Sequence, residues 1–211
     1  MLQSTEVEEW HNGVFQQTVR CEAIWACSDS TGAKVKRNES ELGFLRAAPG
    51  GPPLVRTSDS FWAVRGEERE LRIAHRPRSG MADSTDLLRL RIRAGSLVSL
   101  PGGLPLAVGD SLLITVNVVD AGRVMVELRP AGLQFAPGEP AELEMLYREA
   151  DKDYNNDGSV DSDDDAIEQR LRIWRQGKPG EKWSEIGGSL SLDSDAVTAD
   201  LNGFSRYAVA Y

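Results

Sequence analysis

The chain has 211 residues, of which 40% are hydrophobic and 27% charged, and this composition predicts a globular protein with one large domain, or one domain and an extension. The formal net charge of −9 argues against a nucleic-acid partner, because a binder of duplex DNA needs a basic face to neutralise phosphates. No stretch approaches the ~20 apolar residues of a transmembrane segment. Residues 151–165 contain seven Asp and one Lys, so most of the acidity is local.

The first 59 residues differ in composition from the rest of the chain. They are polar and show little hydrophobic periodicity, and Ala47–Pro53 reads Ala-Ala-Pro-Gly-Gly-Pro-Pro, a sequence that favours neither helix nor strand. We therefore expect residues 1–59 to form a poorly structured N-terminal arm and linker, with a short helix or strand around Val14–Ala26.

Both cysteines, Cys21 and Cys27, lie in this arm. They could pair as a disulfide in an oxidising compartment or remain free thiols. Ile24–Cys27, followed by polar residues, resembles the end of a bacterial lipoprotein signal, in which the cysteine is lipidated. The resemblance implies an extracytoplasmic protein, either secreted or anchored to the cell envelope through a lipid on Cys27. The sequence leaves all three interpretations of the cysteines open.

From Ser60 onward the pattern is that of β-strands. Leu88, Leu90 and Ile92 alternate with three arginines, and this period of two places the aliphatic side chains on one face and the guanidinium groups on the other, solvated face. A series of short strands, separated by Gly, Pro and Asp turns, predicts an all-β fold, an antiparallel β-sandwich over residues 60–211. The other expected strands lie near 61–64, 70–75, 112–119, 124–128, 143–147, 171–174, 183–186, 190–192, 197–201 and 207–211.

The most specific motif is Asp153–Asp164, which has the ligand spacing of an EF-hand calcium loop. Gly158 allows the sharp turn in its middle, and Val160 is expected to anchor the loop to the core. Calcium is a hard cation that takes six to eight oxygen ligands, so the loop predicts a calcium site. The predicted ligands are Asp153, Asn155, Asp157, Ser159 through its carbonyl, Asp161 and Asp164.

One short helix is expected directly after the loop, over Asp163–Arg170, because Asp residues in its first turn and Arg170 at its end suit the helix dipole. The insert therefore spans residues 151–170. The loop ends in Asp instead of Glu and no helix precedes it, so it resembles the single loops of dockerin modules. The second loop of that family is missing, and no cohesin partner is implied. We expect a structural site with a dissociation constant of ~10⁻⁴ to 10⁻³ M. The alternative is a solvated acidic loop without metal.

Four further segments resemble, in their order along the chain, the ZU-five type of β-sandwich, which occurs in netrin receptors, ankyrins and bacterial surface proteins. They are Ile92–Leu97, Val108–Val116, Leu128–Phe135 and Gly203–Val209. Some members of this wider group cleave themselves at a His-Phe-Ser triplet. Here Gly203 replaces the histidine, so no base lies beside Ser205 to activate it, and we expect no self-cleavage.

These observations predict a non-enzymatic, extracytoplasmic module with a structural or adhesive role, stabilised by calcium, whose partner is a protein or glycan at the cell surface. No phosphate loop or nucleophile elbow is present in the sequence, so no catalytic residues are nominated and an enzyme is the third hypothesis. The alternative is a carbohydrate-binding module in which Trp62, Trp174 and Trp183 form the ligand surface. Buried tryptophans would favour the structural module, and an exposed pair would favour the carbohydrate-binding module.

Overall fold

The structure is a computed structural model that describes most of the chain. For residues 5–11, 14–23 and 26–29 it describes the backbone only. For residues 35–78 and 83–211 it describes backbone and side chains.

Three antiparallel strands near the N-terminus form a small meander with the order β1-β2-β3. The element expected around Val14–Ala26 is the middle strand of this meander. The strands are β1 (Thr5–His11), β2 (Val14–Ala23) and β3 (Ala26–Asp29). Cys21 is the backbone partner of Cys27 across β2 and β3. The side chains of both cysteines lie outside the described residues, so the disulfide, free-thiol and lipid-anchor interpretations stay predictions.

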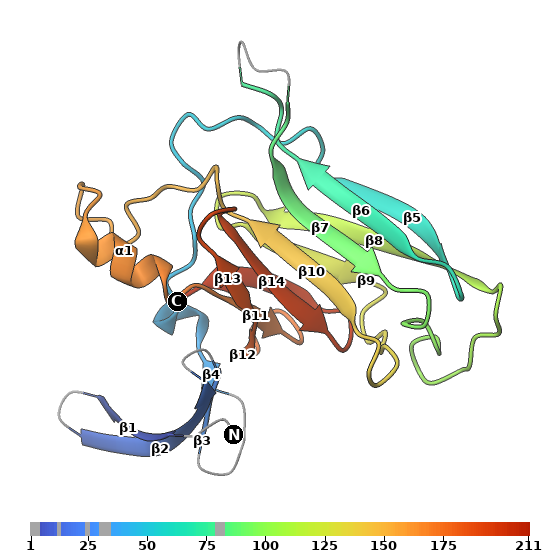
Figure 1. Ribbon diagram of the computed structural model, residues 1–211, viewed down its shortest axis with the longest axis horizontal. Coiled ribbons are helices and arrows are strands. Elements are labelled where there is room, and N and C mark those ends of the chain that lie inside the picture. Colours follow the sequence, from blue (N-terminus) through green and yellow to red (C-terminus); the bar gives the residue numbers. More distant parts are fainter. Residues whose placement is uncertain (1–4, 12–13, 24–25, 30–34, 79–82) are drawn as a thin grey trace.

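Two larger antiparallel sheets confirm the predicted all-β sandwich (Figure 1). The five-stranded sheet has the order β13-β14-β10-β7-β6. Its strands are β6 (Arg69–Ala74), β7 (Asp86–Ile92), β10 (Ala141–Leu146), β13 (Ser189–Ser191) and β14 (Ala196–Leu201). The seven-stranded sheet has the order β4-β12-β11-β15-β9-β8-β5. Its strands are β4 (Lys36–Arg37), β5 (Ser58–Val64), β8 (Ser111–Asp120), β9 (Met125–Arg129), β11 (Arg172–Gln176), β12 (Trp183–Gly187) and β15 (Arg206–Ala210).

The alternation in β7 decides which face of the five-stranded sheet packs on the core. Its three alternating aliphatic side chains are fully buried between the sheets, and the arginines between them lie on the outer face. There Arg89 lies 2.9 Å from a carboxylate oxygen of Glu144, and Arg93 lies 3.0 Å from one of Glu142, both on the neighbouring β10. The predicted solvated stripe is therefore one side of a cross-strand set of ion pairs.

The chain between β4 and β5 differs from the irregular linker that we expected up to residue 59. Leu45 is only 1% exposed, and its amide donates to the carbonyl of Val209 (3.2 Å). The rings of Phe44 and Trp183 meet edge to face with centroids 5.4 Å apart. Leu42 joins the same apolar cluster. Leu42 and Phe44 fasten the segment to the outer face of the seven-stranded sheet, whereas Leu45 belongs to the main core. A count of polar residues along the sequence could not show this.

Glu149 fastens the Pro-Gly part of this segment to the sandwich. Its carbonyl accepts a hydrogen bond from the amide of Ala48 (3.0 Å). Its buried carboxylate accepts hydrogen bonds from Arg78 and from the hydroxyl of Thr85, the latter at 3.1 Å. Burial disfavours the charged carboxylate, but these hydrogen bonds outweigh burial and hold the pKa of Glu149 below its ordinary value.

Replacing Glu149 with glutamine should therefore lower stability at neutral pH and change it little in acid. Because the folded-state pKa is depressed, the carboxylate contributes stability above the ordinary Glu pKa of about 4.3, and this contribution disappears as the pH falls through the folded-state value. The melting temperatures of the wild type and E149Q should differ near neutral pH and converge in acid. A difference that stays constant over that range would contradict the role given to the charge.

Candidate metal centre

The acidic segment connects β10 to β11 and contains α1 (Ser162–Glu168), the one α-helix of the described residues, which lies near the C-terminus of the chain (Figure 1). The helix confirms the expectation for Asp163–Arg170 within two residues at either end. Asp161 caps it, because its carboxylate accepts a hydrogen bond from the amide of Asp163 (2.9 Å). Three Asp residues in the first turn suit the positive end of the helix dipole.

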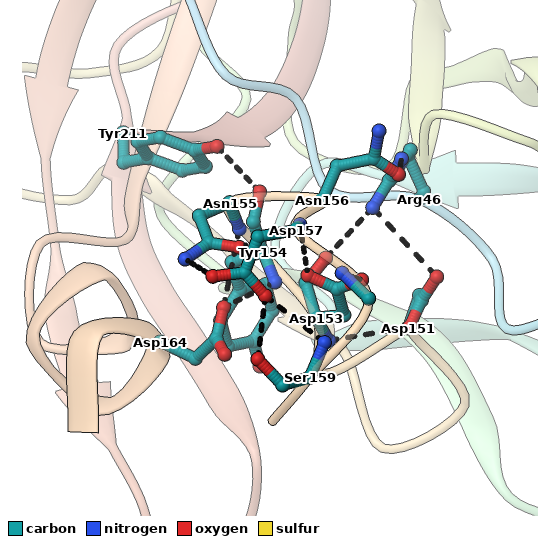
Figure 2. Close-up of polar contacts among 11 residues, drawn as sticks. Arg46, Asp151, Asp153, Tyr154, Asn155, Asn156, Asp157, Ser159, Asp164 and Tyr211 are labelled. Carbon is teal, nitrogen blue, oxygen red and sulfur yellow. Dashed lines mark hydrogen bonds and ion pairs between the residues drawn. The ribbon is translucent and has the colours of Figure 1, made fainter. Parts of the chain in front are cut away.

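The first half of the loop is wound by hydrogen bonds from backbone amides to its own side chains (Figure 2). Asp153 accepts from the amides of Asp157 (3.1 Å) and Gly158 (3.0 Å). The side chain of Asn155 accepts from the amide of Asp157 (2.9 Å). Asp157 in turn accepts from the amide (2.9 Å) and the hydroxyl (2.7 Å) of Ser159. Gly158 has a φ of 91°, in the left-handed region that glycine tolerates best, as the motif requires.

Hydrogen bonds also keep charge in the middle of the loop. Those from the hydroxyl and the amide of Ser159, followed by that from the Asn155 side chain, lower the pKa of Asp157 below its ordinary value. Asp157 therefore stays ionised at neutral pH, although six other Asp residues lie between residues 151 and 165.

Asp164, the last predicted ligand, closes the loop on itself. Its residue is only 1% exposed. One carboxylate oxygen accepts from the amides of Tyr154 (2.6 Å) and Asn155 (3.1 Å), and the other accepts from the amide of Asp161 (3.1 Å). A buried carboxylate with three amide donors holds the start of the loop against the start of α1.

The residue that anchors the loop to the core is Tyr154, and the expectation for Val160 was wrong. Val160 is 66% exposed, whereas Tyr154 is 7% exposed and belongs to the main apolar core. The EF-hand spacing suggested the aliphatic position as the anchor. In this loop the ring of Tyr154, which follows the first predicted ligand, packs into the core of the sandwich instead. Its hydroxyl also donates to Glu168 of α1 (3.2 Å).

Lys152 connects the loop, the helix and the β13–β14 turn. Its ammonium group donates to Glu168 of α1 (2.9 Å) and to Asp195 of the turn (2.8 Å). It also lies 4.6 Å from the ring centroid of Tyr147. Burial opposes the charge on Lys152, but the hydrogen bonds with Asp195 and Glu168 outweigh burial and raise its pKa. The ammonium group therefore stays charged and fixes both ends of the insert to the body.

The loop is also tied to two segments far away in the sequence (Figure 2). Arg46, in the segment before β5, donates to the carbonyl of Asp153 (2.7 Å) and to the side chain of Asn156. The hydroxyl of Tyr211, at the end of the chain, donates to the carbonyl of Tyr154 (2.7 Å). Sequence analysis missed Arg46 and Tyr211, because no local pattern predicts contacts between residues that lie 110 and 57 positions apart in the chain.

The chemistry of the predicted ligands fits calcium. All six supply oxygen donors, which a hard cation prefers, and none supplies nitrogen or sulfur. In the part of the chain that the structure describes, no three His, Cys, Asp or Glu side chains gather as a ligand group. The carboxylates of Asp153, Asp157 and Asp164 are bonded to amides of the loop. A bound ion would require them to turn oxygens toward a common centre.

The three tryptophans do not form a shared surface, so the predicted carbohydrate-binding surface of Trp62, Trp174 and Trp183 is wrong. Trp174 is 3% exposed and Trp183 is fully buried, both in the cluster beneath residues 35–44. The indole of Trp174 donates to the carbonyl of Ala210 (3.2 Å). Only Trp62 is exposed, at 61%, and it lies on β5, at the opposite edge of the seven-stranded sheet from β12. Aromatic residues in short strands gave no sign of which face they occupy.

None of the helices among the described residues is both long and apolar enough to cross a membrane. The likenesses to the ZU-five and dockerin families stay predictions. Comparisons of the chain with protein-family models, with curated proteins and with solved structures found no match.

Proposed function

We propose that this chain is a non-enzymatic structural or adhesive module of the cell surface, stabilised by calcium bound in the Asp153–Asp164 loop. The observation that carries the proposal is the position of the loop. The same twelve residues hold the oxygen donors, cap α1 through Asp161 and receive hydrogen bonds from Arg46 and Tyr211. An ion there would act on the whole sandwich and not on an isolated hairpin.

Calcium would be held by Asp153, Asn155, Asp157, the Ser159 carbonyl, Asp161 and Asp164. It would offset the mutual repulsion of the Asp residues, which lie close together along the loop. Because the unfolded chain holds no such loop, binding would add to the free energy of unfolding by linkage. Calcium is plentiful outside the cytoplasm, so a site of modest affinity suits an extracytoplasmic module, whose partner would be a protein or glycan at the cell surface.

Calcium should raise the melting temperature of the full chain relative to the same protein in a chelator. With free calcium at about 100 times the dissociation constant, linkage adds about 2.7 kcal/mol, or roughly 5–10 °C for a chain of this size. Magnesium should do less, because it demands a smaller, octahedral set of ligands. Isothermal titration should give one site per chain.

Asp153→Asn and Asp163→Asn form a matched pair of variants for this experiment. Each removes one negative charge from the loop, but Asp153 is a predicted ligand and Asp163 is exposed and is not. D153N should abolish the calcium-dependent rise in melting temperature and D163N should keep it. Equal loss in both variants would reduce the effect to general charge screening. No rise in the wild type would remove calcium from the proposed function.

A further inference from the structure

The two sheets of the sandwich end in four edge strands, and three of the four are protected against pairing with another chain. β4 has two residues and β13 has three, too few for a ladder. β6 carries the charged residues Arg69, Glu70 and Arg72 and a register shift between Ile73 and Ala74. Short length, charge and irregular register are the usual means by which natural edge strands avoid other chains.

β5 is less protected, although it carries one charged residue, Asp59, whose carboxylate accepts a hydrogen bond from the amide of Ser60 (2.9 Å). It is seven residues long, and its register with β8 contains no shift from Ser58 to Val64. The order of the seven-stranded sheet ends at β5, so no strand of the described residues pairs with its outer side. An open, regular edge of this length is a template for one more strand.

The backbone groups on the open side can be assigned from the bonds at both ends of β5. The carbonyl of Thr57 accepts from Val118 (2.7 Å), and the amide of Arg65 donates to Asp110 (2.9 Å). Because bonding alternates in an antiparallel ladder, odd-numbered residues bond to β8. The even-numbered residues direct their amides and carbonyls outward. They are Ser58, Ser60, Trp62 and Val64, of which the amide of Ser60 also donates to the carboxylate of Asp59 (2.9 Å) and the carbonyl of Val64 also accepts from the amide of Glu67 (3.1 Å).

The outer face beside this edge is apolar at its centre. Trp62 is 61% exposed, and its direct cross-strand partner on β8, Leu113, is 43% exposed. Exposed tryptophan is enriched in the centres of protein interfaces, where it supplies much contact area at a small entropic cost.

We propose that β5 pairs in antiparallel fashion with β5 of a second copy of this chain, with Trp62 on the twofold axis. A twofold axis makes such an edge self-complementary. In this register Ser60 faces the partner's Val64, and Asp59 faces the partner's Arg65, on the same side of the ladder. The two opposite charges therefore meet twice, once on either side of the axis.

Neighbouring registers lack this complementarity. With Ser60 on the axis, Asp59 faces the partner's Phe61, and with Phe61 on the axis it faces the partner's Ala63. Either choice places a carboxylate against an apolar side chain. Charge complementarity thus favours a second copy in this register, in which the partner's Arg65 would join Arg56, 3.2 Å from Asp59 in the same chain, around one carboxylate. The inference does not depend on calcium, because α1 and β5 lie at opposite sides of the molecule (Figure 1).

Sedimentation equilibrium of the full chain, over nanomolar to high micromolar concentrations and in a chelator, should show a reversible dimer of the 23.1 kDa chain. Trp62→Lys should weaken the dimer by about tenfold or more. Leu192→Lys is the matched control, since Leu192 is 50% exposed but lies just beyond β13, and it should leave the dimer unchanged. Melting curves establish that each variant is folded.

A wild type that stays monomeric at every concentration would overturn the proposal, and so would a dimer that Trp62→Lys leaves intact. The register has its own test. Residues that face one another as a hydrogen-bonded pair lie about 5.5 Å apart between Cα atoms, a distance that a disulfide spans. With Cys21 and Cys27 replaced by serine and Trp62 retained, the double variant Ser60→Cys, Val64→Cys should form a covalent dimer on oxidation and Ser60→Cys alone should not. The opposite result would exclude Trp62 from the axis.

Discussion

Replacing Asp164 with alanine should lower the free energy of unfolding by about 2–4 kcal/mol in the presence of a chelator, even with no metal bound. The residue is 1% exposed, and its carboxylate accepts from the amides of Tyr154, Asn155 and Asp161. Alanine would leave these donors without their partner in a site that water reaches poorly. The expected fall in melting temperature is roughly 5–15 °C.

Asp163→Ala is the control for this prediction. It removes the same side chain one residue away, but Asp163 is exposed and uses only its backbone amide to bond to Asp161. A surface change of this kind should alter stability by no more than about 0.5 kcal/mol. Urea unfolding of both variants gives the comparison. A similar small effect in both would mean that Asp164 does not hold the loop closed.

Leu90→Ala should destabilise the sandwich by about 3–5 kcal/mol, the upper part of the range for a buried leucine. Leu90 is fully buried on β7, between β10 and the edge strand β6 of the five-stranded sheet. It stands opposite Leu143 of β10 on one side and Leu71 of β6 on the other. β10 is also fixed by its ladder with β14, so the cavity could not easily close from that side, and the lost contacts add to the lost transfer energy.

Leu192→Ala provides the comparison for the core, because Leu192 is 50% exposed. The same truncation there should cost less than about 1 kcal/mol. Urea unfolding followed by tryptophan fluorescence reports on Trp174 and Trp183, which are buried in the native state. Equal destabilisation by the two truncations would contradict the placement of Leu90 in the core.

Much of the fold could be predicted because the alternation of apolar and polar residues within a strand shows which of its side chains are buried. The alternation of Leu88, Leu90 and Ile92 with arginines predicted both the strand and its inner face, and all three aliphatic residues are fully buried. Where the local pattern was weak, the prediction failed. The segment before β5 contains only a few apolar residues, among them Leu45, and its sequence gives no period that would reveal the sheet face on which it packs.

In the acidic loop, too, the local features were predicted correctly and the contact with the core was not. Its spacing predicted the winding around Gly158, and the helix after Asp161, because these depend on bonds between residues two to five positions apart. The anchor was misassigned to Val160, because whether an aliphatic or an aromatic side chain reaches the core depends on how the loop leaves β10. The calcium itself stays a prediction.

The sequence by itself therefore determined the strands, their inner faces, the helix and the winding of the acidic loop, since each follows from the periodicity of side chains or from hydrogen bonds over a few residues. Only the tertiary structure decided that Trp174 and Trp183 are buried while Trp62 is exposed, that Arg46 and Tyr211 hold the loop, and that β5 is the open edge. These features depend on the order of strands in the sheets and on contacts between distant segments, which no local pattern encodes.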